Sequence, residues 1–87
     1  MTETGALHAL SERVLREITA LVGCPAEGIT GAHRNDDGWA LTVEVLEMAR
    51  VPETADVLAT YEVETDSHGS VVGYQRQRRY LRGQTDG

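Results

Sequence analysis

The spacing of apolar residues changes once along the chain, and this change constrains the fold more than any other feature of the sequence. Up to Val22 the apolar residues recur every three or four positions, which is the repeat of one face of a helix. Beyond Gly23 and Pro25 they recur at every second position, which is the repeat of a half-buried strand. The sequence therefore predicts one helix followed by strands.

The predicted helix is amphipathic and has recognisable signals at both ends. Thr2 or Thr4 can cap its start, and Gly23 followed by Pro25 supplies its end. Its apolar stripe consists of Leu7, Leu10, Val14, Ile18 and Leu21, widened on one side by Leu15 and Val22. Opposite charges four positions apart on the polar face stabilise a helix by about 0.2–0.5 kcal/mol per pair. The pairs expected here are Glu12 with Arg16 and Arg13 with Glu17.

Four strands are expected, covering about residues 28–34, 39–45, 57–64 and 71–81. Tight turns are predicted at Asn35-Asp36-Asp37-Gly38 and at Asp66-Ser67-His68-Gly69. The segment around Pro52 must be a connection, because proline cannot donate a hydrogen bond inside a ladder. The alternation breaks at Leu46-Glu47-Met48, which indicates a bulge or the end of the second strand.

Short connections between sequential strands favour an antiparallel meander, so we predict an α+β fold of two layers, in which the N-terminal helix packs on a four-stranded sheet. The core is expected to combine the helix stripe with Trp39, Leu41, Val43, Val45, Val57, Ala59, Tyr61 and Val63. The opposite sheet face is expected to be wet and carries Thr42, Glu44, Thr60, Glu62 and Glu64. We expect one domain at residues 6–83, between an N-terminal tail at 1–5 and a C-terminal tail at 84–87.

Charge is distributed unevenly along the chain. Residues 1–66 hold thirteen acids and four arginines, a balance of −9, whereas residues 67–87 hold one acid and four arginines, a balance of +3, for a total of −6. There is no lysine. The chain as a whole therefore gains no electrostatic attraction to nucleic acid or to an anionic bilayer, and only its C-terminal end could do so.

We find no motif that predicts catalysis, a metal site or a cofactor. His8, His33 and His68 lack metal-ligand spacing, and Cys24 has no second cysteine and no basic sequence neighbour that would activate it. An aromatic group of Trp39, Tyr61 and Tyr74 could line a small-molecule cleft between helix and sheet, but core packing is the simpler interpretation. We therefore expect no enzyme activity, no metal, no cofactor and no small-molecule substrate.

The sequence also favours a cytoplasmic protein. Its apolar runs are far shorter than the roughly 20 residues of a membrane-spanning helix, so no membrane association is expected. The N-terminal residues lack the positive and apolar regions of a secretory signal.

The last strand is where local patterns conflict, because arginines occupy positions that should face the core. Val72, Tyr74, Arg76, Arg78, Tyr80 and Arg82 share one parity, and Leu81 falls on the other. One explanation is a bulge between Gln75 and Arg79 that exchanges the faces, with the arginines pairing Glu62 and Glu64 across the hairpin. A compatible second explanation is that the strand extends past the helix and forms an exposed ledge for an acidic protein partner, built from Tyr74, Arg76, Arg78 and Tyr80. A third is nucleic-acid binding.

Three segments together resemble the gas vesicle protein O family. Residues 50–63, RVPETADVLATYEV, resemble its central signature, and residues 73–84, GYQRQRRYLRGQ, resemble its Tyr- and Arg-rich end. Asp37-Gly38-Trp39 followed by Thr42-Val43-Glu44-Val45 is similar to the strand before the signature. The resemblance extends from about Ala9 to Gln84.

The resemblance implies a non-enzymatic accessory protein that supports assembly of the gas-filled, protein-walled organelle used for buoyancy. It implies other gas vesicle proteins as partners and a cytoplasmic location at the vesicle or its assembly machinery. The residues expected to bind a partner are Tyr74, Arg76, Arg78, Arg79, Tyr80 and Arg82. The alternative is a regulatory module that binds nucleic acid through the basic last strand, although nucleic acid is not the expected partner. Homo-oligomerisation is left open.

Overall fold

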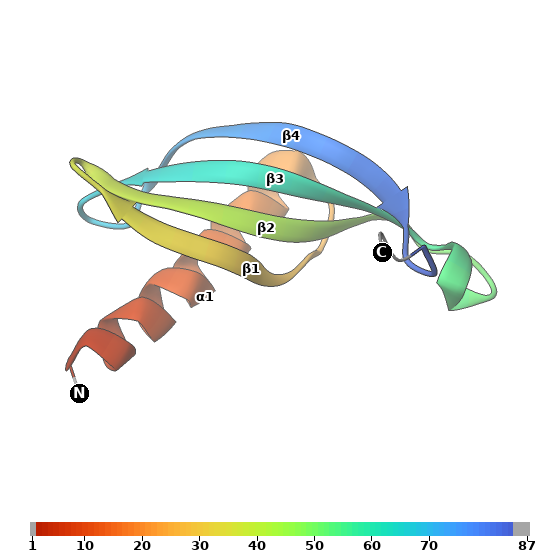
Figure 1. The fold of residues 1–87 in the computed structure, drawn as a ribbon, viewed down its shortest axis with the longest axis horizontal. Helices are drawn as coiled ribbons and strands as arrows, with labels where there is room; N and C mark the ends of the chain where they lie inside the picture. The colour runs from red at the N-terminus through yellow and green to blue at the C-terminus, as the bar shows by residue number, and fades with distance from the viewer. Residues whose placement is uncertain (1, 85–87) are drawn as a thin grey trace.

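The computed structural model describes residues 2–84, with side chains from His8 onward. The helix α1 is followed by four strands and one short 3₁₀ helix, in the order α1 (Thr2–Val22), β1 (Ala26–Asn35), β2 (Gly38–Met48), η1 (Glu53–Ala55), β3 (Val57–Asp66) and β4 (Val71–Leu81). The strands form one antiparallel sheet in the order β1-β2-β3-β4. Helix α1 lies across one face of this sheet, as Figure 1 shows. The predicted two-layer α+β meander is confirmed.

Some expectations fall outside the described residues. They are the capping side chains of Thr2 and Thr4, the side chain of Leu7, and the outer ends of the two expected tails. The division into tails and domain stays a prediction.

Helix α1 ends where the sequence indicates. Gly23 adopts φ +82°, and its N–H donates to the carbonyl oxygen of Thr19 at 3.0 Å, which is the usual left-handed end of a helix. The hydroxyl of Thr19 in turn accepts a hydrogen bond from the N–H of Ala26 at 3.0 Å. Thr19 therefore joins the end of α1 to the first residue of β1, which sets the direction in which the chain enters the sheet.

A second connection holds the middle of α1 to the turn between β3 and β4. The predicted pair of Arg13 and Glu17 is present at 3.1 Å, and Arg13 also donates to the carbonyl of His68 and the hydroxyl of Ser70. The second oxygen of Glu17 accepts the N–H of Val71 at 3.0 Å. This backbone hydrogen bond, with Arg13, lowers the pKa of Glu17 below its ordinary value. Glu12, which was expected to pair with Arg16, has its carboxylate 3.3 Å from Nε2 of His8.

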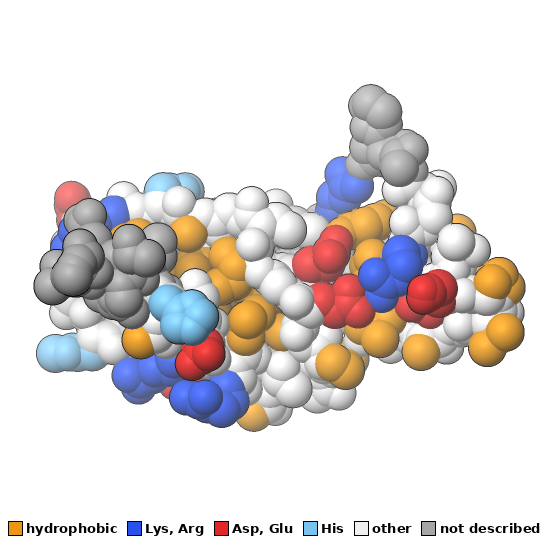
Figure 2. All heavy atoms as spheres, turned by 90° about the horizontal axis from the view of Figure 1, so that it is seen from below, with side chains coloured by type: hydrophobic (Ala, Val, Ile, Leu, Met, Phe, Trp, Pro, Cys, Tyr) orange, Lys and Arg blue, Asp and Glu red, His pale blue; other side chains and the backbone are white. Residues whose placement is uncertain are grey.

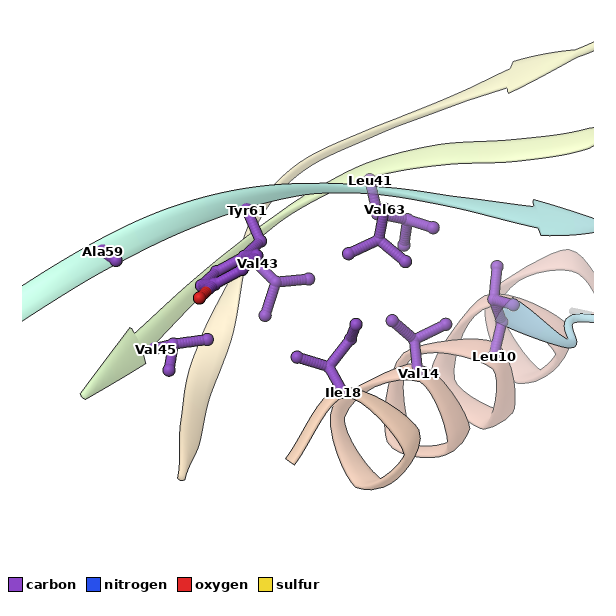
Figure 3. Packing of buried hydrophobic residues seen from close by; sticks show 9 residues of the cluster. All are labelled: Leu10, Val14, Ile18, Leu41, Val43, Val45, Ala59, Tyr61 and Val63. Carbon is purple, nitrogen blue, oxygen red and sulfur yellow. The ribbon is translucent and has the colours of Figure 1, made fainter. Parts of the chain in front are cut away.

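The core lies between α1 and the central strands (Figure 3). It contains Leu10, Val14, Ile18, Leu41, Val43, Val45, Ala59, Tyr61 and Val63. Trp39 and Val57, also expected in the core, are half-buried. Leu21 is 52% exposed, because it lies on the same side of α1 as Glu17, one turn further on, towards the sheet edge formed by β4.

The sheet face opposite α1 is only partly wet. Glu62 and Glu64 are exposed as expected, whereas Leu58 on the same face is 3% exposed. Tyr80 pairs with Leu58 across the ladder, and its hydroxyl donates to Glu44 on β2. The ring therefore crosses over β3 and covers Leu58. The sequence did not predict that Tyr80 would bury Leu58 on the face that was expected to be polar.

Candidate partner-binding surface

The predicted bulge in β4 is present and decides where the arginines point. The register passes from the pair Thr60–Arg78 to the pair Tyr61–Arg76, which leaves Gln77 as the extra residue. A second irregularity leaves Val72 extra near the start of β4. Residues after Gln77 thus have the opposite parity from the residues before it.

The six expected partner-binding residues are divided between two faces by this bulge. Tyr74, Arg76 and Arg79 are paired with Val63, Tyr61 and Ala59, which face α1. Arg78 and Tyr80 pair with Thr60 and Leu58 on the opposite face, where the Arg78 guanidinium lies 4.9 Å from the centre of the Tyr80 ring. Arg82 follows the end of β4. The structure therefore does not bring these residues together on a single ledge.

On the α1 side, the acceptor for two of the arginines is Glu47. Its carboxylate lies 3.1 Å from Arg76 Nη1 and 2.9 Å from Arg79 Nε, and it accepts the hydroxyl of Tyr61 at 3.4 Å. The Glu47 side chain is 13% exposed. Burial, with the nearby Glu47 charge, raises the pKa of Tyr61 above its ordinary value. The carboxylate of Glu47 thus pairs with two guanidiniums and accepts a hydrogen bond from a phenol beside the core.

The pairing of arginines with Glu62 and Glu64, which was part of one of the explanations drawn from the sequence, is therefore wrong for Arg76 and Arg79. Glu62 faces away from α1 and accepts a hydrogen bond from Gln77 at 2.8 Å. Glu47 lies on the α1 side because it has the same parity along β2 as Val43 and Val45, and the register shift between Leu46 and Met48 leaves it without a partner in the ladder to β3. The broken alternation at this point was the available signal, but it located the bulge without identifying its partner.

Arg82 is held by a second ionic group, which includes the nearly buried Asp56. Its guanidinium lies 2.8 Å from Glu27 and 3.0 Å from Asp56, and Asp56 also accepts the N–H of Arg50 at 2.7 Å. The backbone hydrogen bond from Arg50, followed by Arg82, lowers the pKa of Asp56. The hydrogen bonds to Glu27 and Asp56 raise the pKa of Arg82. Sequence reasoning did not connect these residues, since they come from three separate segments.

These contacts cancel much of the charge asymmetry inside the fold. Arg76, Arg79 and Arg82 pair with Glu47, Glu27 and Asp56, so three cations meet three carboxylates. Figure 2 shows acidic and basic side chains next to one another at one end of the molecule, with hydrophobic side chains around them. Arginines in such pairs are less available to an acidic partner or to phosphate than the sequence suggests.

Exposed apolar and aromatic side chains also lie at the edge of the sheet formed by β4 and on the neighbouring side of α1. The Tyr74 side chain is 44% exposed, and its ring centre lies 6.2 Å from that of Tyr61, with the planes tilted by 49°. Val72 and Leu21 are 65% and 52% exposed. A partly exposed tyrosine on a buried aromatic base is typical of protein-binding surfaces.

The remaining candidate residues are the three histidines, the cysteine and the aromatic group. His8, His33 and His68 are exposed, and Cys24 is half-buried against the core. Within residues 2–84, no group of three or more His, Cys, Asp or Glu residues is placed to hold a metal ion. The Arg34 guanidinium lies 5.5 Å from the centre of the Trp39 ring, whereas the rings of Tyr61 and Tyr74 contact each other. In the described part of the chain, no helix is long and apolar enough to span a membrane.

Comparison with known proteins identifies related chains. The sequence matches the family described as "Gas vesicle synthesis protein GvpO" over residues 2–86. It is 53% identical to "Gas vesicle protein O" of Streptomyces sp. (strain CB03234) over 78 residues, which are 85% of this chain and 61% of the relative. It is 46% identical to "Gas vesicle protein O1" of Halobacterium salinarum over 57 residues, which are 66% of this chain and 48% of that relative.

The chain thus spans about 61% or less of the length of the curated relatives it matches. No solved structure matches it. The family match covers the whole of the helix and sheet described above, and it includes every residue of the two ionic groups. The chain therefore belongs to the gas vesicle synthesis protein GvpO family.

Proposed function

We propose that the chain is a non-enzymatic accessory protein of gas vesicle formation that acts by binding another gas vesicle protein. The observation that carries this proposal is the family match over residues 2–86, together with relatives that are named as gas vesicle proteins. A cytoplasmic location, at the vesicle or its assembly machinery, is part of the same proposal.

The proposed contact surface is β4 with its flanking residues. It contains the residues expected from the sequence, Tyr74, Arg76, Arg78, Arg79, Tyr80 and Arg82. Exposure of Tyr74 and Val72 beside a buried aromatic core supports this choice, because tyrosine is enriched at the centres of protein interfaces. The paired arginines then act mainly by holding the strand in place.

The nucleic-acid alternative has weaker support. A phosphate would have to compete with Glu47, Glu27 and Asp56 for three of the four arginines of this end. Binding of phosphate to a chain of net charge −6 would be weak and would fall steeply with salt.

The test is co-purification with each protein encoded beside the vesicle shell protein, expressed singly with a tag. We expect at least one to form a stable complex with the chain. Tyr74→Ala should weaken that complex at least about tenfold, a loss typical of an interface anchor. Thr30→Ala, at an exposed position of the opposite edge strand, is the matched control and should stay within about twofold. If none of these proteins binds the parent chain, the proposal fails.

A further inference from the structure

The outer edge of β4 is the part of the molecule that best fits a defined kind of partner. β4 lies at one end of the strand order and pairs with β3 on its inner side. The backbone of an edge strand directs the N–H and C=O of every second residue away from its neighbour. The hydrogen bonds at the two ends of β4 identify the residues whose N–H and C=O groups point outward.

At both ends of β4, outward backbone groups make hydrogen bonds within the chain. The N–H of Val71 donates to Glu17 at 3.0 Å, and that of Leu81 donates to the side chain of Gln84 at 3.2 Å. The carbonyl of Leu81 also accepts the N–H of Gln84 at 3.0 Å. The N–H groups at both ends of the edge are therefore already used and do not donate to another chain.

Between these ends, the outward-directed residues can be counted from the register. Alternate residues of β3 share one orientation, and those that pair with Leu81 and Val71 are Val57 and Thr65. The residues of β3 between them with the same orientation are Ala59, Tyr61 and Val63, and their partners on β4 are Arg79, Arg76 and Tyr74. Counting alternate residues of β4 from Leu81 or from Val71 gives the same three residues, provided that one position is skipped at each extra residue, Gln77 and Val72.

Tyr74 and Arg76 form a two-residue docking unit, because the extra residue Gln77 separates Arg79 from them. They belong to the regular segment 73–76 between the two extra residues, and together they direct two N–H donors and two carbonyl acceptors outward. The bulges keep this unit short, which limits unspecific pairing along the whole strand. On the α1 side the ring of Tyr74 is exposed, and Leu21, one helical turn beyond Glu17, is exposed as well.

We infer that an extended strand of another protein pairs with the outer edge of β4 at Tyr74 and Arg76, and places an apolar side chain on the α1 side of the sheet. This rests on the proposed function, which supplies the partner as a gas vesicle protein. Main-chain hydrogen bonds provide the affinity in strand addition, and the side chains on the two faces provide the selectivity.

The occupant is a strand of different sequence from β4. Residues 71–81 contain three arginines and no acid, so antiparallel pairing of two copies through their centres would bring arginines opposite or diagonal to arginines. Like charges in these positions are destabilising, whereas an acidic residue opposite an arginine is favourable. A neutral or acidic strand with an apolar residue facing Tyr74 fits this edge.

The direct test is residue-resolved amide exchange of the full chain, alone and with the individual gas vesicle protein that it co-purifies with. The amides of Tyr74 and Arg76 should exchange at least about tenfold more slowly in the complex, whereas that of Gln75, which faces β3, should change little. A complex that leaves the exchange at Tyr74 and Arg76 unchanged would overturn the strand-addition inference and leave the proposed function standing.

A matched pair of variants separates the backbone from the ring. Tyr74→Pro removes an outward N–H, which an edge strand tolerates, and should abolish the complex. Tyr74→Phe keeps the N–H and should bind within about threefold of the parent. A folded Tyr74→Pro variant that binds normally contradicts the inference; if that variant does not fold, the amide exchange decides. A concentration-dependent dimer of the chain alone, with slowed exchange at Tyr74 and Arg76, would overturn the assignment to a different protein.

Discussion

At the scale of single residues, Glu47 decides how far the arginines of β4 are available for binding. The carboxylate is nearly buried and is shared by Arg76 and Arg79, which are themselves about half exposed. Loss of a shared, poorly solvated acceptor leaves both guanidiniums close together without a counter-charge. Charge reversal at Arg76 would likewise place a carboxylate beside Glu47, so such a variant tests the fold as well as the binding.

Glu47→Ala is therefore expected to lower the free energy of unfolding by about 1–2 kcal/mol, the range for charged hydrogen bonds of partly exposed groups. Urea denaturation followed by circular dichroism measures this. Glu64→Ala is the control, because Glu64 is exposed on the opposite face, and surface substitutions usually stay within about 0.5 kcal/mol. Equal losses in the two variants would show that the Glu47 contacts contribute nothing specific.

Asp56 gives stability a defined dependence on pH. Its pKa in the folded chain lies below the ordinary value of 3.8, chiefly because it accepts the N–H of Arg50, and then because of Arg82. A depressed carboxyl pKa stabilises the fold above about pH 4, and this contribution is lost as pH falls through the folded-state pKa. Asp56→Asn should therefore unfold more easily at pH 7 and lose less additional stability between pH 5 and pH 3 than the parent. If the free energy of unfolding of the variant and that of the parent fell equally between pH 5 and pH 3, the prediction would be contradicted.

At the scale of elements, the periodicity of the sequence predicted one helix, four strands and their order, because each element is amphipathic over a whole face. It also predicted irregularities at Leu46-Glu47-Met48 and within 75–79, where alternation and charge disagree. The partners across those bulges could not be predicted, since one extra residue exchanges every side chain beyond it between the faces. The ledge of Tyr74, Arg76, Arg78 and Tyr80 divides between two faces for that reason.

Gly38 lies where the backbones of β2 and β3 come very close to each other. It is buried at the start of β2, opposite Asp66, and a Cβ atom there would overlap the carbonyl oxygen of Thr65. Gly38→Ala is expected to cost about 1–3 kcal/mol or more, because backbone must move to relieve the overlap. Gly28→Ala is the matched control in β1, where a Cβ would meet nothing within 4 Å. Thermal unfolding of both variants checks this; equal melting temperatures would contradict it.

At the scale of the whole molecule, α1 covers only part of one sheet face, and the two layers meet through a small core (Figure 3). A domain of 87 residues has a free energy of unfolding of about 4–13 kcal/mol, at roughly 0.05–0.15 kcal/mol per residue. One large side chain in the interface between the layers therefore represents a large fraction of the total. Exposed apolar residues beside β4 contribute little to that total and are available for a partner.

Ile18 and Leu21 allow folding and binding to be separated on the same helix. Ile18 is fully buried against the sheet, so Ile18→Ala should lower the free energy of unfolding by about 2–5 kcal/mol. Leu21 is 52% exposed, so Leu21→Ala should change it by less than about 1 kcal/mol. If Leu21 borders the strand site at β4, the second variant should nevertheless bind the gas vesicle partner several-fold more weakly. Denaturation and a binding titration measure the two effects. A Leu21→Ala variant of parental stability and parental affinity would limit the contact surface to β4 itself, because the side of α1 would then contribute to neither process.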